Sequence, residues 1–144
     1  MREILFKAKR IDNGEWVYGN YAFTDTNGEQ HFIFQNKAFE HEVDKNTICQ
    51  YTGLTDKNGN KICENDILSV LLIGEPDEEK ENCIVRYGRK AENFRIELGF
   101  NLEWTKTYYL RCDICFWIEN REVEVIGNIF DNAELLDLGN EDAE

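Results

Sequence analysis

The stretch that decides the fold is ILFKAKRIDNGEWVYGNYAFTDTNGEQHFIF, residues 4–34. Two Asn-Gly pairs, Asn13-Gly14 and Asn27-Gly28, divide it into three segments of strand-like composition. Asn-Gly tolerates the positive φ angles of tight hairpin turns, so each pair is expected to reverse the chain between two antiparallel strands. The N-terminal part of the chain is therefore predicted to be a β meander, with strands in the segments 4–10, 15–23 and 30–34.

Strand-like segments continue through the rest of the chain. A third Asn-Gly pair, Asn58-Gly59, follows a domain boundary that we place near residue 52. A helical pattern occurs in the segment 131–138, where Asp131 or Asn132 can cap the start and Gly139 the end. The chain is thus predicted to be mainly β with a short C-terminal helix and a flexible acidic tail, 140–144. Further strands are expected at 67–73, 83–87, 93–98, 108–118 and 122–126.

The composition is that of a globular protein. Of the 144 residues, 42% are hydrophobic and 31% are charged, which is enough apolar material for a core without disulfide bonds. No apolar run approaches the roughly 20 residues that span a membrane, and the N-terminus lacks the pattern of a signal peptide. We therefore expect a cytoplasmic protein.

The formal net charge of −13 limits the partners that the chain can bind. A field of this sign repels phosphate groups and anionic lipids, so direct binding to nucleic acid or to a membrane is not expected. The same field attracts a basic protein surface, or a metal ion at an acidic patch.

The nearest approach to a chemical motif is Cys112-Asp113-Ile114-Cys115, because a gap of two residues serves both zinc sites and redox pairs. On the expected strand 108–118, Cys112 and Cys115 have opposite parity and face opposite sides. A redox pair is also expected at a helix N-terminus, and no helix is predicted here. The five cysteines are therefore interpreted as reduced structural thiols, and neither a cofactor nor a metal is expected.

The same alternation gives the strand 108–118 a second apolar face. A strand that is apolar on both sides is usually covered on both sides. We expect this face to contact the N-terminal meander or a second copy of the chain. It is the first candidate interaction surface, and its residues are Tyr109, Cys115 and Trp117.

The second candidate interaction surface is an acidic stretch that contains the only proline. It is predicted to be a solvated loop between strands. Its carboxylates could hold a hard cation, but the residue order of a calcium-binding loop is absent. The acidic residues of this stretch are Glu75, Asp77, Glu78, Glu79 and Glu81.

The remaining residue types indicate no catalytic residue. A histidine needs an oriented partner before it can act as a base or a ligand, so His31 and His41 are interpreted as ordinary surface residues. The aromatic residues of the meander could stack on nucleic-acid bases, but sheet cores use the same residues, and this second interpretation is favoured. These residues are Trp16, Tyr18, Tyr21, Phe23, Phe32 and Phe34.

Three blocks of sequence, taken together and in order, resemble the YopX family of small proteins encoded by phages and prophages of low-GC Gram-positive bacteria. The resemblance implies a C-terminal SH3-like β-barrel in the segment 53–139, after the meander of 1–52, and it implies no activity. Two residues depart from the pattern of the family: Cys63 replaces an aromatic residue, and Asn65 stands at a glycine position where it can adopt a left-handed conformation. The blocks are REILFKAKR (2–10) with GEWVYG (14–19), QYTGLTDKNG (50–59) with KI (61–62) and DI (66–67), and VEVIGNI (123–129) with DN (131–132) and ELL (134–136).

Three functions remain open at this point. The favoured one is a non-enzymatic phage or prophage accessory protein that binds another protein, with a basic partner or a second copy of the chain as the candidates. The second is an acidic mimic of nucleic acid that inhibits a host DNA-binding enzyme. The third is a metal-dependent hydrolase or nuclease, which has the least support because its motifs are absent.

Overall fold

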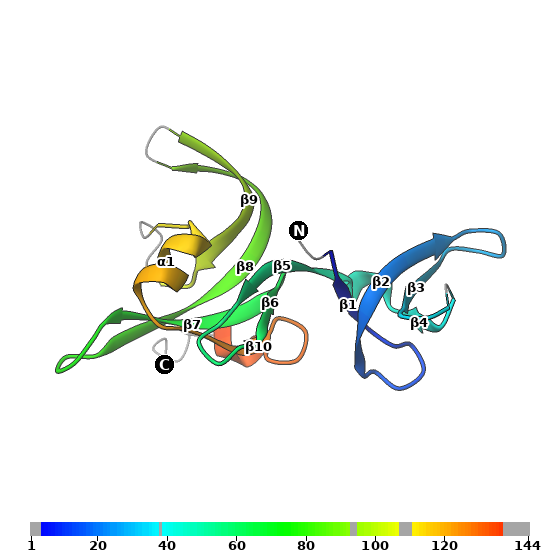
Figure 1. The fold of residues 1–144 in the computed structure, drawn as a ribbon, viewed down its shortest axis with the longest axis horizontal. Coiled ribbons are helices and arrows are strands. Elements are labelled where there is room, and N and C mark those ends of the chain that lie inside the picture. The colour runs from blue at the N-terminus through cyan, green and yellow to red at the C-terminus, as the bar shows by residue number, and fades with distance from the viewer. Residues whose placement is uncertain (1–3, 38, 93–94, 107–110, 137–144) are drawn as a thin grey trace, which may run out of the picture. The chain divides into compact units, whose positions relative to one another are not determined.

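The computed structural model describes residues 4–37, 39–92, 95–106 and 111–136. The chain divides into two compact units, unit 1 (Met1–Gly53) and unit 2 (Leu54–Glu144). The described part is mainly β, with one α-helix and two short 3-10 helices. The two sheets are antiparallel, as Figure 1 shows.

Unit 1 contains the predicted meander. Its first three strands pair in sequence order, and the turns between them contain Gly14 and Gly28 at φ of 73° and 93°. The prediction that Asn-Gly pairs make these turns is therefore confirmed. The elements of this part of the chain are β1 (Phe6–Lys9), β2 (Trp16–Thr24), β3 (Gln30–Phe34), β4 (His41–Val43), the 3-10 helix η1 (Lys45–Thr47) and β5 (Cys49–Thr55).

Strand β4 lies beside β3 and also beside the end of β1. Arg10 and Val43 form an isolated bridge, and the amide of Asp44 donates to the carbonyl of Lys9 at 2.9 Å. The sheet therefore curls around a small core of Ala8, Ile33 and Val43. Strand β1 also pairs with β5, which continues past Gly53 and has β6 as its next neighbour in the sheet.

Unit 2 contains a second sheet with the strand order β10-β7-β8-β9. Among the described strands no closed barrel is found, so the SH3-like barrel stays a prediction. The strands after the boundary are longer than expected, because β8 begins at Glu79 and its hairpin with β9 extends to the pair Glu92 and Arg95. The elements are β6 (Lys61–Cys63), β7 (Asp66–Ile73), β8 (Glu79–Glu92), β9 (Arg95–Trp104), α1 (Ile114–Asn120), β10 (Val123–Asn128) and η2 (Ala133–Leu136).

The predicted strand 108–118 is wrong over its second half, where the chain forms α1. Asp113 is the N-cap, and its carboxylate accepts from the amide of Cys115 at 3.1 Å. Ile114 and Trp117 are three residues apart and share the buried face, as a helical period requires. The C-terminal helix is also corrected: its described part is the 3-10 helix η2, and the tail lies outside the described residues.

The second and third blocks of the family resemblance meet inside unit 2. The Asp56 carboxylate accepts from the amides of Asn58, Asn60 and Val125 at 2.8 to 2.9 Å. Burial alone would raise its pKa, but these backbone donors lower the pKa of Asp56 below its usual value. Asn65 has the expected left-handed conformation, with φ of 72°. These two blocks therefore stabilise the fold of unit 2.

Candidate functional site

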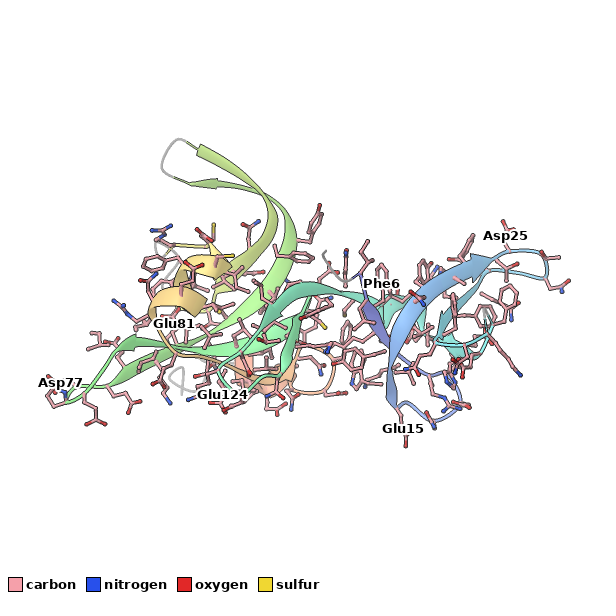
Figure 2. The ribbon with its side chains drawn as sticks, viewed as in Figure 1. Phe6, Glu15, Asp25, Asp77, Glu81 and Glu124 are labelled. Carbon is pink, nitrogen blue, oxygen red and sulfur yellow. The ribbon has the colours of Figure 1, made fainter. Side chains whose placement is uncertain are left out.

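The acidic stretch does not form one continuous surface. Glu75, Asp77 and Glu78 are exposed in the turn between β7 and β8, and Figure 2 shows Asp77 at its outer end. Glu81 is only 6% exposed, and its carboxylate accepts from the amide of Lys106 at 2.8 Å. Strand β8 already contains Glu79 and Glu81, so the predicted loop ends before them; Glu79 is nevertheless exposed, and the expectation of a solvated residue is wrong only at Glu81.

The apolar face predicted for 108–118 is also divided. Trp117 is 6% exposed and belongs to the core of unit 2, where its ring meets that of Trp104 edge-on at 5.2 Å. Both indole nitrogens donate to the carbonyl of Arg111 at 2.9 Å. Cys115 is exposed, whereas Tyr109 lies outside the described residues. Trp117 is therefore unavailable to a partner.

The two cysteines of Cys112-Asp113-Ile114-Cys115 flank the start of α1, so the strand argument against a redox pair does not hold. Burial raises the pKa of the Cys115 thiol, and the carboxylates of Asp113 and Glu119 raise it further. Reactive redox thiols have a lowered pKa, so Cys115 has the wrong electrostatic environment for this chemistry. All five cysteines lie in the described part of the chain, and none of them forms a disulfide bond there.

A chain of hydrogen bonds around His31 in unit 1 was not found by sequence reasoning. The Tyr21 hydroxyl lies 2.6 Å from Nδ1 of His31, and Nε2 of the same ring lies 2.7 Å from Oε2 of Glu29. Nζ of Lys45 lies 3.3 Å from both oxygens of Glu29. Four residues from β2, β3, the turn between them and η1 are thus connected in one network.

The network defines the direction of each hydrogen bond. An ionised carboxylate only accepts, so Nε2 of His31 carries a hydrogen and donates a hydrogen bond to Oε2 of Glu29. In the neutral ring Nδ1 is then an acceptor, and the Tyr21 hydroxyl donates to it. The His31 and Lys45 donors, in this order of effect, lower the pKa of Glu29. Both ring nitrogens are occupied, so His31 offers neither of them to a substrate as a base.

Three rings form what we call the aromatic strip, defined as Tyr21, Phe23 and His31. The Tyr21 and His31 rings are stacked at 5.8 Å with an interplanar angle of 10°, and Phe23 lies 4.9 Å from His31. Tyr21 is 37% exposed and Phe23 is 51% exposed. The interpretation of the meander aromatics as core residues is therefore wrong for these two and for Tyr18, which is also 37% exposed, although it is correct for the buried Phe32.

A depression of about 430 Å³ adjoins the strip, because Glu29 and His31 also line it. Arg10 at its edge is held by both oxygens of Asp12, at 3.0 and 2.7 Å. The rest of the lining mixes charged and apolar residues and includes Lys9, Ile11, Glu42, Asp44 and Lys45. Such a depression can accept side chains of a partner, with polar groups that determine their orientation.

Metal and membrane sites receive no support from the described residues. Within the ranges that the structure describes, no group of three or more histidine, cysteine, aspartate or glutamate residues could hold a metal ion. Among the same residues, no helix has the length and apolar character needed to cross a membrane.

Comparison with known proteins gives the family and a similar solved structure. A search of curated proteins found no match. The crystal structure of protein EF1440 from Enterococcus faecalis is similar, with a TM-score of 0.54 and 26% sequence identity over 94% of this chain and 99% of that chain. The family model described as YopX protein matches residues 5–137, which include both units up to η2. The chain therefore belongs to the YopX family.

Proposed function

We propose that the chain is a non-enzymatic accessory protein of a phage or prophage, and that it binds another protein through the aromatic strip of unit 1. The observation that carries this proposal is the exposure of Tyr21 and Phe23 on a strand where neighbouring rings and hydrogen bonds hold them in place. Exposed aromatic residues are enriched at the centres of protein interfaces.

The local rigidity of the strip favours binding. Tyr21 and Phe23 project from a paired strand, and His31 contacts both rings. Aromatic side chains have few rotatable bonds, and ordering them in advance reduces the entropy that is lost on association. The adjoining depression adds a concave surface with mixed charge. Together these features support a contact in which apolar rings meet a partner and polar groups orient it.

The placement of four carboxylates favours binding through the aromatic strip over mimicry of nucleic acid. A mimic presents carboxylates in rows at about the spacing of phosphates. In unit 1, Glu15 and Asp25 lie at opposite ends of β2 (Figure 2). In unit 2, Asp77 lies at the end of a turn, whereas Glu81 is buried in β8.

Affinity capture tests this proposal. Tagged wild-type protein is incubated with a lysate of Enterococcus faecalis, the source of the similar structure, and bound proteins are identified by mass spectrometry. Phe23→Ser is expected to lose the captured partner, because it removes an exposed ring without opening a cavity in the core. The matched control is Tyr87→Ser in unit 2, which removes a ring that is 57% exposed and is expected to retain capture.

Two results would contradict the proposal. One is capture of the same partner by Phe23→Ser at the wild-type level. The other is equal loss in Phe23→Ser and Tyr87→Ser, which would mean that general surface hydrophobicity rather than the aromatic strip causes capture. A circular dichroism spectrum and a thermal melt of each variant show that the fold is retained.

A further inference from the structure

We infer that the aromatic strip takes an arginine side chain of the partner protein. This inference rests on the proposed function and adds the chemistry of the occupant. It follows from three properties of the strip: the direction of its hydrogen bonds, its exposed rings and the sign of the surrounding charge.

The polar groups of the strip are acceptors. With the His31 ring neutral and its Nε2–H directed at Glu29, the Tyr21 hydroxyl donates its hydrogen bond to Nδ1, so the hydroxyl oxygen presents only lone pairs to an incoming group. Glu29 at the other side of the same ring is a carboxylate and also only accepts. Arginine and lysine only donate hydrogen bonds and also carry a positive charge, so they complement a surface of acceptors that includes the Glu29 carboxylate. A carboxylate or a phosphate would find no donor at these two residues.

The rings favour arginine over lysine. The guanidinium group is planar and stacks on aromatic faces, whereas an ammonium group is a compact and strongly hydrated charge. Tyr21 and Phe23 expose ring surface beside the two acceptors. An arginine side chain can place its planar group on this ring surface and donate to the acceptors at its border.

Charge complementarity agrees with this occupant. The turn between β2 and β3, residues 25–29, carries the carboxylates of Asp25 and Glu29 and no basic residue. Unit 1 as a whole has a formal net charge of −2, which also has the sign that attracts a cationic segment. Lys45 already contacts Glu29, but its side chain is 53% exposed and the ion pair is 3.3 Å long, so it leaves acceptor capacity on the carboxylate.

A synthetic peptide tests the inference directly. Isothermal titration calorimetry compares three peptides of the same Gly-Ser backbone that carry three arginine, three lysine or three citrulline residues. Citrulline has the shape of arginine without its charge. We expect the arginine peptide to bind most tightly, the lysine peptide more weakly and the citrulline peptide at least about fivefold more weakly than arginine, the factor expected for about 1 kcal/mol.

Matched variants locate the binding. Glu29→Gln and Tyr21→Phe are each expected to weaken the arginine peptide by at least about fivefold. Glu78→Gln removes the same charge from the exposed turn of unit 2 and is expected to leave the affinity unchanged. Two-dimensional amide NMR spectra of the three variants verify their fold.

Three outcomes would overturn the inference: no saturable binding of the arginine peptide, equal affinity for the citrulline peptide, or equal losses in Glu29→Gln and Glu78→Gln. The last would reduce the effect to general attraction by net charge. These failures are distinct from a failure of the proposed function. If capture of a partner depends on Phe23 but the protein binds the arginine and citrulline peptides equally, the proposed function stands and only the arginine inference fails.

Discussion

The two units differ in how they use charge and aromatic residues. Unit 1 contains six lysine and arginine residues and eight aspartate and glutamate residues, which gives a formal charge of −2. Unit 2 contains ten basic and twenty-one acidic residues, which gives a formal charge of −11. Unit 1 exposes Tyr21 and Phe23, whereas unit 2 buries Trp104 and Trp117 in its core. The difference teaches that the net charge of the whole chain describes mainly unit 2, while the surface best suited to specific contact is in unit 1.

The largest expected effect tests whether the aromatic core of unit 2 is structural. Trp117→Ala should lower the free energy of unfolding by about 3 to 5 kcal/mol, because it removes a buried ring and the indole that bonds to the Arg111 carbonyl. Chemical denaturation monitored by circular dichroism measures this change. Cys115→Ala, two residues away and exposed, is the control and should change stability by less than about 0.5 kcal/mol. Equal small effects would mean that Trp117 is not part of the core.

The second prediction concerns the carboxylate that joins two family blocks in unit 2. Asp56→Asn should destabilise the protein by about 2 kcal/mol, because an amide nitrogen replaces one of the two oxygens that accept backbone hydrogen bonds. Asp25→Asn, at an exposed turn, is the control. Denaturant midpoints of the two variants give the comparison, and an unchanged midpoint for Asp56→Asn would contradict the structural role of the block.

The pH dependence of stability follows from the same carboxylate. The pKa of Asp56 is lower in the folded state than its ordinary value of 3.8. Its contribution is therefore complete above about pH 4 to 5 and is lost as the pH falls through the folded-state pKa. Wild-type protein should lose more stability than Asp56→Asn between pH 5 and acidic conditions. Parallel curves for the two proteins would show that Asp56 has no lowered pKa.

The smallest effect separates the carboxylates of the acidic stretch. Glu81→Ala should destabilise unit 2 by about 1 kcal/mol, since it removes the acceptor of the Lys106 amide at an exposed residue where water can replace part of the bond. Glu78→Ala, in the exposed turn, should change stability by less than about 0.5 kcal/mol. Thermal melts at equal protein concentration distinguish the two. Similar midpoints would mean that both residues are simply solvated.

The meander could be predicted because its determinants are local. Asn13-Gly14 and Asn27-Gly28 mark the turns. Each turn joins two strands that follow one another in sequence, and these strands pair with each other. The helix α1 was not predicted, because apolar residues at alternate positions of 108–118 favoured a strand over the whole segment. The sequence nevertheless contains a helical signal, since Asp113 is a good N-cap and Ile114, Trp117 and Ile118 have the i, i+3, i+4 spacing of a helix face.

The hydrogen-bond network of His31 was harder to find, because it depends on strand register. Phe23 pairs with His31 across the hairpin, which brings Tyr21 diagonally beside the same ring. Composition and spacing along the chain do not show that Tyr21 and His31 are neighbours. The register of the hairpin, which the turn at Gly28 sets, does show it. A register derived from the Asn27-Gly28 turn could therefore have predicted contact between Tyr21 and His31. The contact between Lys45 and Glu29 could not be predicted in this way, because it depends on the position of η1 in the folded unit.

Hydrogen–deuterium exchange of the captured complex tests the central claim, that the aromatic strip is the binding surface, most directly. Exchange is followed by mass spectrometry for the chain alone and for the chain with its purified partner. We expect amides in β2, β3 and the turn between them to gain protection on binding, and amides in the turn between β7 and β8 to show no change. Protection confined to unit 2, with unchanged exchange in residues 16–34, would contradict it.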